Sequence, residues 1–94
     1  MILNGHAHDF EYFEPRLPSG VKDPRGIAQI VVGTGGPVDP MDPVDRLEAG
    51  VAYGEIRIGD TPGILRLTLG TDAYRWEFVG TDNAVLAHGK GTCH

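Results

Sequence analysis

The sequence predicts a single small domain over residues 1–94 that is mainly β, an antiparallel β-meander or half-sandwich with one short helix. Three observations favour this fold class. The 14 glycines and 7 prolines exceed ordinary usage and are typical of many turns between short strands. The β-branched run Ile27–Val32 is bounded by glycines, as expected of a buried strand. After Gly54, segments of alternating apolar and polar residues follow one another, separated by turn residues.

The first 25 residues contain less regular elements. The Ile-Leu pair at 2–3 is expected to end a short buried strand, which the Asn-Gly pair at 4–5 breaks. Segment 10–15 is aromatic and acidic without a clean alternation, so we expect a partly ordered excursion with at most one short helical turn. Segment 16–25 contains proline, glycine and aspartate and is predicted to be a solvated loop.

The glycine-rich segment 33–36 admits two interpretations. Backbone N–H groups exposed by glycines after a strand can cradle a phosphate. The G-x-G-x-x-G spacing and the P-loop lysine are both missing from the sequence, so a sharp turn with positive φ is favoured. The short helix is predicted within segment 42–50, with Asp42 as its N-cap, Pro43 as its first helical residue and Gly50 just past its end.

The carboxy-terminal half is predicted to form a meander with strands over 55–58, 65–69, 74–78 and 84–87. One register of the central hairpin satisfies both of its faces, pairing Leu69 with Tyr74, Leu67 with Trp76 and Leu65 with Phe78 on the core face, and Arg66 with Glu77 on the outer face. The Tyr-Trp-Phe stripe is therefore expected to belong to the core. Residues 88–94 are expected to form a tail, in which the single cysteine is a free thiol.

Charge and hydropathy argue against several classes of partner. The formal net charge is −5, with 8 Lys+Arg against 13 Asp+Glu, which argues against binding to nucleic acid or to an anionic membrane. No apolar run approaches the roughly 20 residues that span a bilayer. The sequence starts without a basic region or an apolar leader, so no signal peptide is expected.

The chemistry of the chain concentrates at His6 and His8. On an extended backbone, residues two apart project to the same side, so both imidazoles could bind one metal ion or line a metal pair. The alternative is two partly exposed histidines in a turn, hydrogen-bonded to backbone carbonyls, and the spacing alone favours it. Asp9, Glu11 and Glu14 lie close in sequence and could bind the metal themselves or orient an imidazole from outside the ligand shell.

Taken together, the motifs of this chain resemble the carboxy-terminal portion of bacterial calcineurin-like metallophosphoesterases, with the purple-acid-phosphatase type as the most similar branch. The motifs that carry the resemblance are N-G-H-A-H-D-F-E (4–11), D-P-R-G-I (23–27), V-V-G-T-G-G (31–36), G-I-L-R-L-T-L (63–69), Y-R-W-E-F-V (74–79) and G-T-C-H (91–94). The resemblance implies the last part of an α/β/β/α sandwich.

In such enzymes the G-H-x-H element closes a two-metal site that hydrolyses phosphate esters. The resemblance implies that His6 is a ligand of the second metal and His8 of the first, with Zn, Fe or Mn as the metal. It also implies that Asn4 shapes the turn and that Glu11 supports the site from outside the ligand shell. The chain departs from the family's G-H-x-H-x-Y-E-R pattern, because Phe10-Glu11-Tyr12 lacks the arginine.

The family's upstream D-x-H, G-D and G-N-H ligand elements are missing from the sequence, and Gly59-Asp60 matches one of them only in letters. We therefore expect a carboxy-terminal segment of a two-metal phosphoesterase that is inactive alone and pairs with a missing amino-terminal half or with a second copy. The alternative hypothesis is a stand-alone metal-binding or oligomeric assembly module without catalysis.

Overall fold

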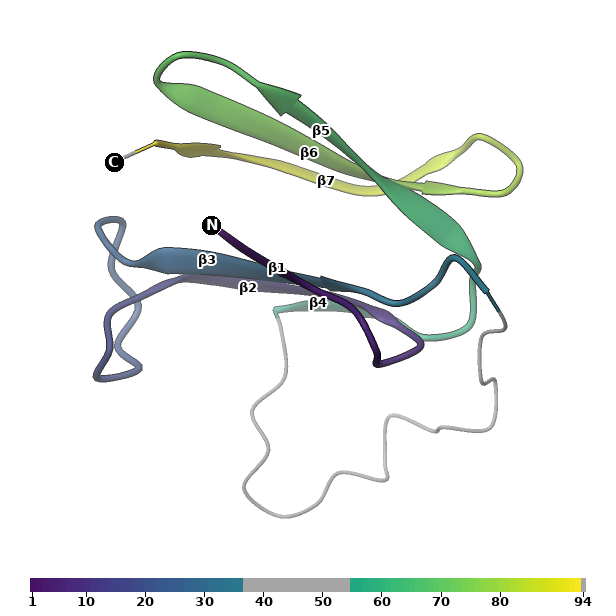
Figure 1. The fold of residues 1–94 in the computed structure, drawn as a ribbon, viewed down its shortest axis with the longest axis horizontal. Helices are drawn as coiled ribbons and strands as arrows, with labels where there is room; N and C mark the ends of the chain where they lie inside the picture. Colours follow the sequence, from purple (N-terminus) through teal and green to yellow (C-terminus); the bar gives the residue numbers. More distant parts are fainter. Residues whose placement is uncertain (37–54, 94) are drawn as a thin grey trace.

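The computed structural model describes residues 1–36 and 55–93, which form two β-sheets stacked face to face (Figure 1). The strands in these ranges are β1 (Ile2–Asn4), β2 (Phe10–Arg16), β3 (Ile27–Val32), β4 (Ile56–Ile58), β5 (Gly63–Leu69), β6 (Ala73–Gly80) and β7 (Val85–Thr92). One sheet has the order β1-β3-β2-β4 and the other the order β5-β6-β7. The predicted mainly β, largely antiparallel fold is confirmed, whereas the helix predicted over 42–50 lies outside the described residues.

Aromatic side chains from both sheets form the core between them. The ring of Phe10 on β2 stacks on Phe78 of β6 with 4.4 Å between centroids, and its centroid lies 5.7 Å from that of Trp76. Tyr12 also packs against Trp76, with 4.7 Å between ring centroids. Large rings dominate the energetics of a core this small, because each buries far more apolar surface than an aliphatic side chain does.

The hairpin of β5 and β6 has the register that the sequence predicts. Leu65, Leu67 and Leu69 are opposite Phe78, Trp76 and Tyr74, and Arg66 is opposite Glu77. The three aromatic residues are at most 7 % exposed, which confirms their place in the core. On the outer face, Arg66 Nε donates to Glu77 Oε2 at 2.7 Å.

Strand β7 is longer than predicted, because the glycines at its end pack beneath aromatic rings. Gly89 is opposite Trp76 and Gly91 is opposite Tyr74. A Cβ atom at Gly89 would lie 2.6 Å from the indole, and one at Gly91 would lie 2.3 Å from the Tyr74 hydroxyl oxygen. These glycines therefore leave room for the rings, and the expected tail at 88–92 is strand. Cys93, beyond the strand, is an exposed free thiol, as predicted.

Segment 10–15, expected to be irregular, is instead part of strand β2, which lies between β3 and β4. The alternation is hidden in the sequence because both faces of this strand are at least half-buried. Phe10 and Tyr12 face the core, while Glu11 lies opposite Arg57 of β4. The register shifts between Phe13 and Arg16, at a position where a proline is tolerated.

Two further expectations about strands are corrected. Strand β4 does not begin the meander: it pairs with β2 in the other sheet, and the chain then crosses to β5. The crossing is held by Thr34, whose buried hydroxyl donates to the Gly63 carbonyl at 2.8 Å and whose carbonyl accepts from the Gly63 N–H at 3.2 Å. Strand β1 exists as predicted but is exposed, because it forms the edge of its sheet beside β3.

Glu55, just before β4, joins an ionic network with residues from β2 and the loop that follows it. Its carboxylate accepts from Arg16 Nη2 at 2.5 Å and from the Glu14 N–H at 2.7 Å, and it lies 3.0 Å from Lys22 Nζ. Burial alone would raise the pKa of Glu55. The hydrogen bonds from Glu14, Lys22 and Arg16 outweigh burial and lower the pKa from 4.5 to about 2.

We expect the free energy of unfolding of Glu55→Gln to fall less steeply than that of the wild type as the pH is lowered below about 4.5. A carboxyl whose pKa is depressed in the folded state contributes stability above its unfolded pKa of about 4.5, and this contribution is lost as the pH falls towards about 2. Urea unfolding at several pH values in this window should therefore show a shallower decline for the variant than for the wild type. Identical slopes would contradict the proposed role of the network.

Candidate functional site

The two histidines lie in the loop that joins β1 to β2. Because β1 and β2 flank β3 on opposite sides, this loop must cross the end of β3. His6 and His8 are both exposed, and the segment is bent rather than extended. The backbone here is therefore not the extended one on which both imidazoles would project to the same side. His6 has a φ of 79°, a left-handed conformation that a non-glycine residue adopts at a cost of roughly 1–2 kcal/mol.

The loop is held against the segment that follows β3. Gly33 packs so closely on the loop backbone that a Cβ atom built on it would lie 1.8 Å from the Ala7 carbonyl oxygen. Its N–H also donates to the Asp9 carbonyl at 3.1 Å. The structure thus brings together the G-H-A-H and G-T-G-G motifs, which are separate in the sequence.

The glycines at 33–36 do not form the predicted turn with positive φ. Gly20 is the one glycine with positive φ in the part of the chain that the structure describes. Gly33 is required for close approach of two backbones, and a side chain at that position would occupy the space of the histidine loop.

A buried ion pair begins at Asp9, the residue that follows His8. Asp9 is 5 % exposed, and its Oδ2 accepts from Arg57 Nε at 2.8 Å. Its other carboxylate oxygen, Oδ1, is buried with no hydrogen-bond partner among the residues described. Glu11 Oε1 lies 3.9 Å from the same Arg57 atom. Sequence reasoning considered Asp9 and Glu11 near the histidines but missed Arg57, because it placed strand 55–58 in the meander.

The structure shows where the three residues expected to support a metal site lie. Asn4, on β1, accepts a hydrogen bond from Gln29 Nε2 of β3 at 2.9 Å, so its side chain ties the edge strand to its neighbour just before the loop. Glu11 is buried on β2, opposite Arg57. Glu14 is exposed in part and pairs with Lys22 at 2.7 Å, away from the loop.

The arrangement offers two imidazole donors on a loop of fixed backbone. Within residues 1–36 and 55–93, no group of three or more His, Cys, Asp and Glu side chains is placed to hold a metal ion. A structural zinc site needs about four protein ligands and a catalytic one about three plus water. A metal at His6 and His8 would therefore need further donors from outside the described residues.

Comparisons with known proteins add no assignment. No family model, no curated protein and no solved structure matches this chain significantly. In the described part of the chain there is also no helix of the length and apolar character needed to cross a membrane.

Proposed function

We propose that this chain is the carboxy-terminal segment of a two-metal phosphoesterase, in which His6 and His8 serve as metal ligands. The observation that carries the proposal is the loop of exposed imidazoles, whose backbone is held by Gly33 and strained at His6. Strain of this kind persists where the surrounding structure fixes it, and it clusters at functional sites. Paired metals polarise a phosphoryl oxygen and lower the pKa of a bound water.

The buried pair of Asp9 and Arg57 suits this proposal as a support for the loop. A ligand that must be held within about 0.5 Å of its working position needs a rigid backbone and locked neighbours. Asp9 directly follows His8 and is anchored from β4, while its carbonyl is bound by Gly33. The loop that contains His6 and His8 is thereby attached to β4 and to the segment that follows β3.

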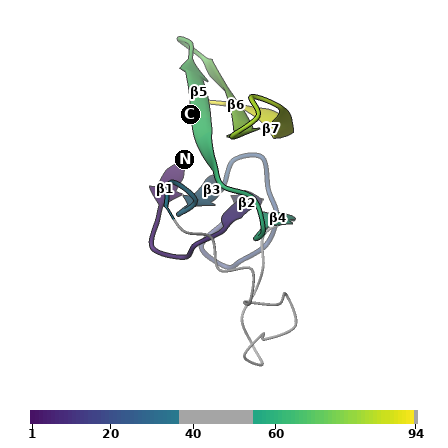
Figure 2. The same cartoon turned by 90° about the vertical axis from the view of Figure 1, so that its right-hand side faces the viewer.

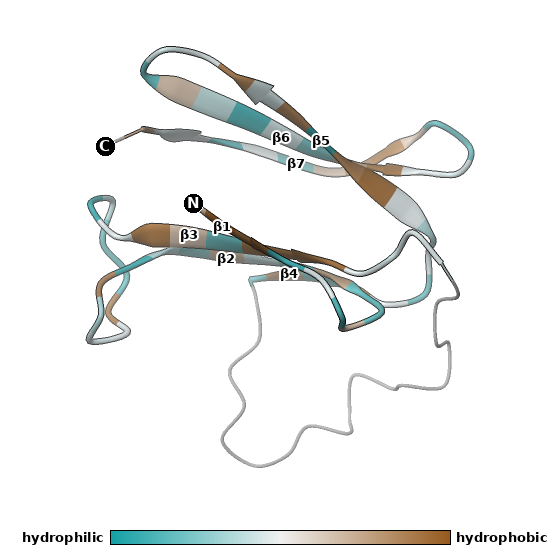
Figure 3. Cartoon of the chain, viewed as in Figure 1, coloured by the Kyte–Doolittle hydropathy of each residue, from teal (hydrophilic) through white to brown (hydrophobic). Residues whose placement is uncertain are grey.

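The remaining donors would come from polypeptide that covers the edges of the sandwich. The edge strands β1 and β5 lie on the same side of the molecule (Figure 2). Both are rich in apolar residues (Figure 3), and Ile2, Leu3, Ile64 and Leu69 are 46, 49, 63 and 72 % exposed. Open edges with exposed apolar side chains favour pairing with another chain or segment. An amino-terminal half is the partner that would also supply metal ligands.

The experiment is to read the DNA that precedes the Met1 codon and to express the longest in-frame product. We expect that product to hydrolyse a phosphate monoester in the presence of Zn, Fe or Mn. His6→Ala and His8→Ala should each lower kcat/KM by at least about 100-fold, since changes outside the ligand shell alone cost 10–100-fold. Asp60→Asn is the matched control: Asp60 belongs to the Gly-Asp pair that only imitates a ligand motif, and its loss should leave the rate unchanged.

The metal content of the 94-residue chain separates this proposal from a stand-alone metal-binding module. We expect the chain, purified without an affinity tag, to hold much less than one equivalent of Zn, Fe or Mn and to show no phosphatase activity. One equivalent that is lost in His6→Ala would favour the stand-alone module. A stop codon directly upstream of Met1, in frame, would have the same consequence.

A further inference from the structure

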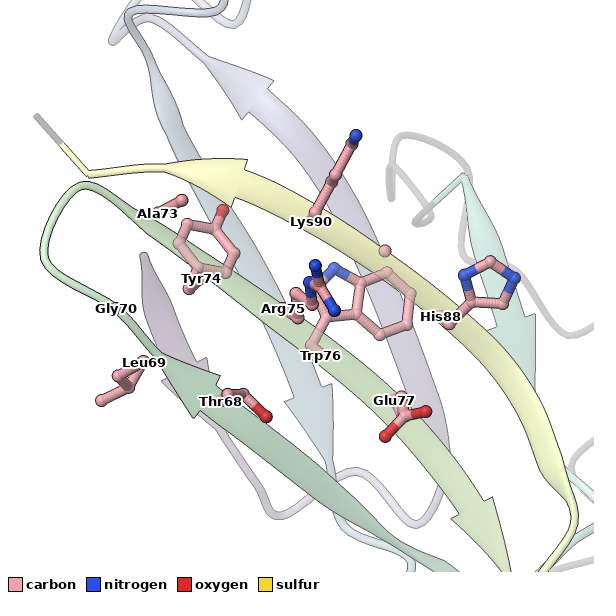
Figure 4. Close-up of a pocket in the computed structure, with 11 residues that line it drawn as sticks. Thr68, Leu69, Gly70, Ala73, Tyr74, Arg75, Trp76, Glu77, His88 and Lys90 are labelled. Carbon is pink, nitrogen blue, oxygen red and sulfur yellow. The ribbon is translucent and has the colours of Figure 1, made fainter.

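The outer face of the sheet β5-β6-β7 places two cations directly opposite each other. Arg75 on β6 pairs with Lys90 on β7, and Thr68 on β5 is opposite Arg75 on the other side. All three residues are exposed and line a hollow on this face, together with His88 (Figure 4). Neither Arg75 nor Lys90 forms an ion pair with any residue that the structure describes.

Like charges directly opposite each other across two strands destabilise a sheet. The carboxylate on this face, Glu77, already accepts from Arg66 at 2.7 Å. Arg66, then His88 and Arg75, lower the pKa of Glu77. This face thus carries three cations, Arg66, Arg75 and Lys90, and the carboxylate of Glu77, although the net charge of the chain is −5. This concentration of positive charge is costly unless an anion offsets it.

We propose that this face binds a phosphate dianion, free or as a monoester, between Arg75 and Lys90. The planar guanidinium of arginine donates to two oxygens of a phosphate at once, and the lysine ammonium adds a point charge. The Thr68 hydroxyl, in the same cross-strand row, is a further donor. A dianion offsets both cations, whereas a monocarboxylate offsets one. The inference is independent of the metal-site proposal, because it concerns the other sheet and other residues.

The test is to follow the full 94-residue chain by thermal unfolding and by amide NMR shifts at about pH 8, where phosphate is largely a dianion. Inorganic phosphate should raise Tm, and it should move the amide signals of Arg75 and Lys90 saturably, beyond the effect of sodium chloride at equal ionic strength. Glycerol 2-phosphate should act similarly if a monoester fits, and a response to inorganic phosphate alone would assign the face to the free ion.

Arg75→Gln and Lys90→Gln should each raise Tm in chloride by roughly 1–5 °C, because they relieve the repulsion between the two cations. Both should abolish the response to phosphate, while Lys90→Arg should retain it. Arg25→Gln is the matched control, since Arg25 pairs with Asp23 in another part of the molecule at 2.8 Å. A phosphate effect no larger than that of chloride, or one retained in both Gln variants, would overturn the proposal.

Discussion

Gly33→Ala is expected to destabilise the domain by about 3 kcal/mol or more, which is a large part of the stability of a chain of this length. The new methyl carbon would lie 1.8 Å from the Ala7 carbonyl oxygen and 2.7 Å from the Ala7 carbonyl carbon, so the backbone of the loop must move. Urea unfolding followed by the fluorescence of Trp76 measures the loss, because this single tryptophan is 1 % exposed.

Gly35→Ala is the matched control for this prediction. It lies two residues further along the same segment, without positive φ, and its Cβ would meet nothing within 4 Å among the described residues. Where the backbone permits alanine, replacing a glycine stabilises a protein by about 0.4–1 kcal/mol, because the unfolded chain then has fewer conformations. Similar losses in the two variants would mean that glycine at 33 is required for a reason other than contact with the histidine loop.

The features predicted correctly from the sequence are those that depend on neighbouring residues. A short turn joins β5 to β6, and the alternation of apolar and polar residues specifies both faces of this hairpin. Its register therefore follows from the sequence alone. Strand β3 was also predicted, because its β-branched run is bounded by glycines. The mainly β fold class follows from these elements.

The features that the sequence did not reveal depend on contacts between strands that the pattern of a single segment does not contain. Strand β2 lacks a clear alternation in the sequence because its outward residue Glu11 is also buried, opposite Arg57, which lies 46 residues later in the chain. The glycines of β7 are typical of a tail when the segment is taken alone. Their role in the strand is to leave room for the rings of Trp76 and Tyr74 on the preceding strand. Periodicity describes one segment at a time and contains no information about which segments will pair.

The candidate site, too, is predicted from the sequence only in part. His6 and His8 were identified from residue type and spacing, but their bent backbone results from the position of β1 beyond β3. That strand order also explains why Gly33 meets Ala7. The buried Asp9–Arg57 pair could have been suspected only if β4 had been assigned to the sheet of β2.

Arg57→Met is expected to cost about 3–5 kcal/mol, because it leaves the buried Asp9 carboxylate without the cation that offsets its desolvation. Urea unfolding measures the change. The chain provides a matched control in Arg66→Met, which removes a pair of nearly the same geometry, 2.7 Å against 2.8 Å between Nε and the carboxylate oxygen. That pair is exposed, with side-chain exposures of 53 % and 36 %, so solvent screens it and its loss should cost far less than the loss of Arg57.

The double variant Asp9→Leu/Arg57→Met gives the sharper result. Replacing both members of a buried ion pair by apolar groups of similar volume is often neutral, whereas removing one leaves an uncompensated charge. We therefore expect the double variant to recover part of the stability that Arg57→Met loses, because the buried Glu11 carboxylate, 3.9 Å from Arg57, also loses its cation. Equal losses in Arg57→Met and Arg66→Met would show that burial does not govern the Asp9–Arg57 pair, and an additive double variant would show that the two residues stabilise the loop independently.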